Sequence, residues 1–159
     1  MSQFPLVQFP LGRKSPAQSE LSARIVFAIT LDTDGTDIRL TMEEEGSGGR
    51  DYIAIKQDTL VEVVLRGKQL FFSKAHDAIT MKGPDLEYYY GQLEYGEYDD
   101  KLDRYKCVRF VARFNRGGKR GTTHGFNVNV DLLQTGGTCP RWVGLTIDPD
   151  IKNPPPTEN

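Results

Sequence analysis

Apolar and polar residues alternate along most of the chain, which is the pattern of strands that bury one face in a sheet. The alternation is clearest over residues 25–31, 38–42, 61–65, 126–132 and 143–147. Residues two apart share one face of a strand, so each run predicts one strand. In the last run Val143, Leu145 and Ile147 form the expected buried face, which leaves Trp142 on the opposite face with Gly144 and Thr146.

Turn-forming residues separate these runs, and the turns set the number of strands. Glycine-rich or Asp-rich turns occur at 32–36, 46–49, 82–85, 115–118 and 135–137. The one helical candidate, residues 15–23, is short and lies at the edge of the alternating region. About eight to ten short strands at this spacing predict an all-β fold, an antiparallel β-sandwich of the Ig-like or jelly-roll-like kind.

Proline placement suggests where the folded region begins and ends. Pro84 is the only proline between Pro16 and Pro140. Since proline cannot donate a hydrogen bond to a sheet ladder, this distribution is typical of an uninterrupted sheet with irregular ends. We therefore expect an extended N-terminal arm over 1–23, a β-sandwich domain over 24–152 and a Pro-rich flexible tail over 153–159.

The N-terminal arm contains an imperfect five-residue repeat with the apolar positions Phe4, Leu6, Phe9 and Leu11. An apolar, proline-spaced segment cannot form a helix and is a poor free tail, so we expect it to dock on a folded surface. The arm could dock on its own sandwich. Alternatively, it could add to a strand of a neighbouring subunit, which would predict self-association.

Charge is nearly balanced overall, at −2, but it is divided into two blocks. Residues 85–103 contain seven acidic side chains, and residues 104–120 contain seven basic ones and no acidic one. The two blocks could pair across neighbouring strands. Alternatively, the basic Gly-rich loop 113–121 could bind an anion through its cations and backbone amides. The residues proposed for that site are Arg113, Arg116, Lys119, Arg120 and His124.

Aromatic residues gather at the same boundary, and some of them must leave the core. Tyr88, Tyr89 and Tyr90 are consecutive, so a strand would direct them to both faces. An outward tyrosine, or an outward Trp142, could stack on a sugar or a base or lie at a protein interface. Alternatively, neighbouring strands or loops cover these side chains.

Composition excludes several classes of protein. A chain of 159 residues fits one domain, and the sequence contains no apolar run long enough for a membrane helix and no secretory signal, so we expect a soluble, cytoplasmic protein. The near-neutral charge gives no strong nucleic-acid signal. Two cysteines and two histidines, without ligand spacing or a nucleophile motif, predict no metal site, no cofactor and no catalytic set.

The segments 124–134 and 147–154 resemble small bacterial proteins that carry the label "nucleotide synthetase". The resemblance covers the C-terminal third of the chain and implies nucleotide chemistry. The sequence contains no phosphate-binding motif of the NTPase kind, because Lys119 is followed by Arg120 and no strand-to-helix context surrounds it.

These observations support three functional hypotheses. The first is a non-enzymatic binding or assembly module that forms a homo-oligomer. The second is a nucleotide or phosphate-ligand protein, which could be an enzyme, that uses the basic loop 113–121. The third is a carbohydrate-binding module that depends on exposed aromatic side chains. The sequence predicts self-association and a small anionic or sugar ligand, with no membrane partner.

Overall fold

The computed structural model describes residues 6–8, 23–34, 37–82, 92–112, 122–134, 139 and 141–153. Twelve strands occur in this part of the chain, and no helix occurs there. Their bounds are β1 Leu6–Gln8, β2 Arg24–Asp34, β3 Asp37–Glu44, β4 Ile53–Ala54, β5 Thr59–Arg66, β6 Leu70–Phe72, β7 Ile79–Met81, β8 Gln92–Asp99, β9 Arg104–Ala112, β10 Thr122–Gln134, β11 Arg141–Ile147 and β12 Asp150–Asn153.

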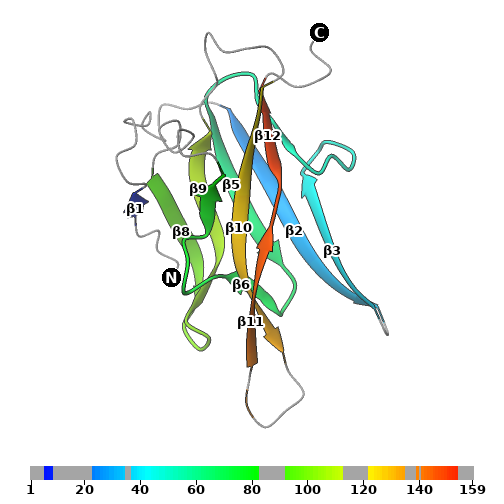
Figure 1. The fold of residues 1–159 in the computed structure, drawn as a ribbon, viewed down its shortest axis with the longest axis vertical. Coiled ribbons are helices and arrows are strands. Elements are labelled where there is room, and N and C mark those ends of the chain that lie inside the picture. The colour runs from blue at the N-terminus through cyan, green and yellow to red at the C-terminus, as the bar shows by residue number, and fades with distance from the viewer. Residues whose placement is uncertain are drawn as a thin grey trace.

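The strands form two sheets that pack face to face (Figure 1). The first sheet has the order β1-β8-β9-β5-β2-β3. The second has the order β11-β10-β12-β4, and β6 and β7 also pair with β10. The prediction of an all-β sandwich is confirmed, and two details differ from it. The structure contains twelve strands, and the sheets are mixed, because β2 pairs in parallel with β5 and β12 in parallel with β4.

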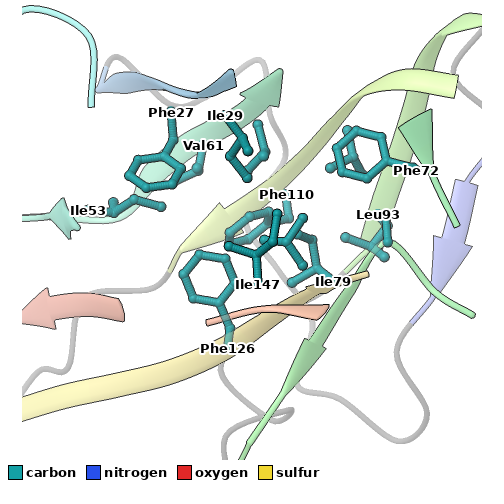
Figure 2. Close-up of a cluster of buried hydrophobic side chains, with 14 of the residues drawn as sticks. Phe27, Ile29, Ile53, Val61, Phe72, Ile79, Leu93, Phe110, Phe126 and Ile147 are labelled. Atoms are coloured by element: carbon teal, nitrogen blue, oxygen red, sulfur yellow. The ribbon is translucent and has the colours of Figure 1, made fainter. Parts of the chain in front are cut away.

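The core lies between the sheets and is built by the alternation seen in the sequence. Phe27 and Val61 of the first sheet and Phe126 and Ile147 of the second belong to one buried cluster, and Figure 2 shows these side chains converging from both sides. The rings of Phe110 and Phe126 meet edge to face across the interface, 6.0 Å apart. Burying such side chains is the main source of stability for a fold of this kind.

Strand β10 organises the second sheet because it is thirteen residues long and has neighbours on both edges. Along one edge it pairs with β7 and then β6, and along the other with β12 and then β11. Strand β11 therefore lies at the edge of the sheet, and Figure 1 shows it running along β10 to the lower end of the molecule.

The edge position of β11 corrects one expectation about burial. Val143 and Leu145 do face the same way as the core residues Val130 and Ile147, but they are 37% and 42% exposed. The first sheet does not extend over them. Alternation correctly predicted which face of β11 carries Val143 and Leu145. It could not predict how far the first sheet extends over that face.

Candidate functional site

A groove of about 580 Å³ lies where β10, β11 and the β6–β7 loop meet. Directly opposite residues of an antiparallel pair share one face of the sheet. The pairs Asn129–Thr146 and Asp131–Gly144 therefore lie on one face, and the core residue Val130 lies on the other. The residues that line the groove are Ser73, Lys74, Ala75, His76, Arg104, Asn129, Val130, Asp131, Trp142, Gly144, Leu145 and Thr146.

The floor of the groove is formed by every second residue of β11. Trp142, Gly144 and Thr146 share one face of the strand, as the sequence predicted. A methyl group added to Gly144 would meet no atom within 4 Å, so the floor is open between the indole and the hydroxyl. The middle of the floor is therefore bare main chain, against which a flat ligand can lie.

One end of the groove is fixed by a buried ion pair. Arg104 Nε donates to Asp131 Oδ2 at 2.8 Å, and the two side chains are 11% and 12% exposed. The Arg104 guanidinium also lies 4.0 Å from the centre of the Trp142 ring, and Phe71 meets that ring edge to face at 5.7 Å. These contacts hold the indole in one orientation and cover one of its faces.

The wall of the groove is the β6–β7 loop, which is hydrogen-bonded to β10 at both ends. At the start, Ser73 N donates to Asn129 O at 3.0 Å and Lys74 N donates to Asp131 Oδ2 at 3.1 Å. At the end, Asn129 Nδ2 donates to Asp77 O at 2.8 Å. The intervening residues 74–76 are exposed, so Lys74 and His76 reach solvent at the rim.

A second cavity, of about 310 Å³, lies on the other side of the same loop. Tyr95 and Tyr105 line it, with ring centres 5.3 Å apart. Lys74 Nζ pairs with Asp103 Oδ2 at 2.5 Å, and Asp103 also accepts a hydrogen bond from the Tyr98 hydroxyl. The Lys74 hydrogen bond lowers the pKa of Asp103, and the bond to Asp103 raises the pKa of Tyr98 to about 12.

The groove thus combines three kinds of recognition group. The Trp142 indole is apolar and flat, Asn129 and Thr146 are neutral hydrogen-bonding groups, and Lys74 and Arg104 are cations. Thr146 already donates to Asn129 Oδ1 at 3.1 Å, so both side chains are held in place before any ligand arrives. Sites of this composition suit a ligand with a flat ring at one end and negative charge at the other.

Only some of the residues singled out from the sequence belong to the part of the chain that the structure describes. Trp142 lies in the groove. His124 lies in β10, opposite Ile151 of β12. The remaining candidates of the basic loop and of the tyrosine run lie outside the described residues. They are Arg113, Arg116, Lys119, Arg120, Tyr88, Tyr89 and Tyr90.

The N-terminal arm is described only at 6–8, where it forms β1. Leu6 pairs with Glu94, so this part of the arm adds to the β8 edge of its own first sheet. Phe4, Phe9 and Leu11 lie outside the described residues.

Sequence reasoning missed Lys74, Arg104 and Asp131 as groove residues. The division into charge blocks suggested that Arg104 would pair with an acid of 85–103, and the register does set Asp99 opposite it. The Arg104 guanidinium nevertheless binds Asp131, 27 residues away. The available signal for this pair was Asp131, an acid within the alternating run 126–132. The structure buries its carboxylate, and a buried carboxylate requires a partner.

Two further findings concern metal ligands and membrane helices, and both refer to the described ranges. Within them no group of three or more His, Cys, Asp or Glu residues could hold a metal ion. No helix that could span a membrane is found there either.

Comparison with known protein families assigns the chain to one of them. No curated protein matches the chain. A family model described as "Predicted novel nucleotide synthetase" matches residues 1–156, which is far more of the chain than the C-terminal third that carried the resemblance in the sequence. The match includes every residue of the groove. The chain therefore belongs to the predicted novel nucleotide synthetase family.

Proposed function

We propose that the chain binds a nucleotide in the groove between β11 and the β6–β7 loop, as a substrate or product of the synthesis that the family description implies. The observation that carries the proposal is the open floor of the groove at Gly144, which lies between Trp142 and Thr146, with Lys74 at the rim. The volume of the groove, about 580 Å³, falls in the range of small-molecule sites.

The composition of the groove suggests how the ligand lies. The base rests on the bare main chain at Gly144, beside the indole edge, because Arg104 already covers one face of the Trp142 ring. The Thr146 hydroxyl can accept a hydrogen bond from the polar edge of the base or from the sugar, since its own hydrogen is donated to Asn129. The phosphates lie toward the rim, where Lys74 is 59% exposed.

Lys74 is the cation best placed to bind phosphate. Arg104 is buried and neutralised by Asp131. Lys74 makes an exposed pair with Asp103, and an exposed pair of this kind contributes little, so exchanging Asp103 for a phosphate carries a small cost. Charge-assisted bonds to phosphate are among the stronger hydrogen bonds in proteins.

Thermal unfolding with a panel of nucleotides tests this proposal. A ligand at about 100 times its Kd stabilises the folded state by about 2.7 kcal/mol, which for a chain of this size raises Tm by roughly 5–11 °C. We expect at least one nucleotide to produce such a shift and its nucleoside to produce a smaller one. No shift with any nucleotide contradicts the proposal.

A matched pair of variants locates the site. Lys74→Ala removes the proposed phosphate ligand, and we expect it to reduce nucleotide affinity about 10-fold or more, since a hydrogen bond to a charged group contributes about 1.5–3 kcal/mol. Lys82→Ala is the control, because Lys82 also makes an exposed pair with an aspartate, Asp148, but lies outside the groove.

The basic loop 113–121 is the competing site for phosphate. A chain carrying Arg116→Ala and Lys119→Ala should keep its nucleotide affinity if the groove is the site. If that chain loses binding while Lys74→Ala retains it, the groove proposal is wrong and the basic loop is favoured.

A further inference from the structure

The free edge of β11 lacks the features that usually prevent sheet edges from pairing with other chains. Protein sheets protect their edges with short strands, charged side chains, prolines or bulges. Strand β11 has seven residues, and its pairing with β10 continues without a bulge from Arg141 to Ile147. Arg141 is its only charged residue, and no proline interrupts it.

The other sheet edges in the described ranges do carry such protection. Strand β1 has three residues and β4 has two. Strands β6 and β7, on the opposite side of β10, have three residues each. Strand β3 is eight residues long but contains four charged residues. The part of β8 beyond its pairing with β1 contains Glu97 and Asp99 within five residues. Strand β11 is therefore the one long and weakly charged edge among them, and no described strand pairs with its outer side.

Apolar side chains beside this edge are exposed. Val143 and Leu145 are 37% and 42% exposed on the face that points toward the first sheet. They are two of the four large hydrophobic residues that the described part of the chain exposes, and they lie two residues apart on one strand. A partner strand added to β11 would place its own side chains against them.

The sequence of β11 is complementary to itself. Two antiparallel copies overlap over all seven residues only when the two-fold axis passes through Gly144. In that register Val143 lies opposite the partner copy's Leu145, and Arg141 lies opposite an isoleucine, so no like charges meet. A self-complementary strand of this kind is what a two-fold interface requires.

We propose that β11 pairs antiparallel with β11 of a second copy, centred on Gly144, to form a homodimer with one continuous sheet. This surface differs from the N-terminal arm to which the sequence analysis attributed self-association. The proposal does not rest on nucleotide binding. It also brings the two grooves together, because Thr146 of one copy then lies opposite Trp142 of the other on the groove face.

Sedimentation of the full chain at increasing concentration tests the dimer. We expect a species of twice the 17.9 kDa chain mass to increase with concentration. Leu145→Lys places a charge opposite an apolar residue and should shift the chain toward monomer. Leu40→Lys, on the β3 edge, is the matched control, since Leu40 is 39% exposed and should tolerate the change without loss of dimer.

A charge-pair variant tests the register independently of folding. Val143→Glu alone should also favour monomer. Combining it with Leu145→Lys in one chain sets the introduced glutamate opposite the partner's introduced lysine at both positions, so the dimer should return. A chain that stays monomeric at every concentration contradicts the proposal, as does a dimer that neither single substitution weakens.

Disulfide trapping gives a geometric test. Opposite Cα atoms of antiparallel strands are about 4.5–5.5 Å apart, which a disulfide can bridge. In a Cys139→Ser background, Gly144→Cys should yield a covalent dimer when oxidised glutathione is added. Thr146→Cys should not, since its two copies lie roughly 13 Å apart along the strands. Equal trapping at both positions, or trapping at Thr146→Cys alone, overturns the register.

Discussion

Asp131 is the residue whose removal should most clearly expose how the groove is held together. Its carboxylate accepts bonds from Arg104 Nε at 2.8 Å and from Lys74 N at 3.1 Å. Both bonds end on Oδ2, so Asp131→Ala removes the two of them at once. It leaves a guanidinium that is 11% exposed without its counter-charge and frees the start of the β6–β7 loop.

The expected loss is large because the pair is buried. At 2.8 Å and an effective dielectric constant of about 20, the Coulomb attraction is about 6 kcal/mol before desolvation is subtracted. Removing one partner of a buried pair typically costs about 3–5 kcal/mol. For a chain of this size the loss lowers Tm by roughly 6–20 °C. We expect Asp131→Asn to cost less, since the amide keeps one acceptor.

Urea unfolding, monitored by tryptophan fluorescence, measures the free energy of unfolding that Asp131→Ala removes. Trp142 is the only tryptophan in the chain and lies under the Arg104 guanidinium. Glu45→Ala is the control, because the Glu45–Arg66 pair is about half exposed and should contribute no more than about 1 kcal/mol. A loss below about 1 kcal/mol for Asp131→Ala would refute the reasoning, since the buried pair would then behave like an exposed one.

Further predictions concern three polar groups in or beside the core, those of Tyr95, Lys106 and Cys107. Tyr95→Phe should cost about 1–3 kcal/mol in urea unfolding, because the Tyr95 hydroxyl accepts a bond from Ala78 N at 2.8 Å inside the core. Lys106→Met should cost a similar amount by the same measurement, because its ammonium donates to two main-chain carbonyls, at 2.5 and 2.9 Å. Burial raises the pKa of Cys107 to about 12, so thiol labelling near pH 8 should modify Cys139 alone until urea is added. Since the unfolded thiol has a pKa of about 8.5, the contribution of Cys107 to stability should be present below that pH and be lost as pH rises toward 12. Cys107→Ala should flatten that part of the stability profile, and an unchanged profile would contradict the assignment.

Residue alternation predicted the local part of the fold well. It gave the strand over 126–132, the shared face of Trp142, Gly144 and Thr146, and the antiparallel pairing of β2 with β3. The loop predicted at 32–36 is too long, because β2 continues to Asp34. It could not reveal that β2 and β5 are parallel. A half-buried strand alternates with a period of two whether it pairs parallel or antiparallel with its neighbour. The direction of β5 relative to β2 depends on the path that the chain takes through β3 and β4.

The groove was less predictable because its parts come from distant positions. Arg104 and Asp131 are 27 residues apart and meet only after β9 and β10 have packed at one end of the sandwich. Lys74 lines the same groove from the β6–β7 loop, whose sequence has no feature except its polarity that indicates a binding site. Trp142 was identified from alternation alone. Identifying the residues next to it on β10 required the register between β10 and β11, which the sequence does not contain.

The most direct test of nucleotide binding in the groove is the fluorescence of Trp142 during nucleotide titration. The single tryptophan forms part of the groove floor, so its emission reports on this site. We predict a saturable change in emission that Gly144→Val abolishes, because the added side chain fills open space on the floor without meeting atoms of the protein at its Cβ. An unchanged emission at nucleotide concentrations that raise Tm would place the bound nucleotide elsewhere and contradict the groove as the binding site.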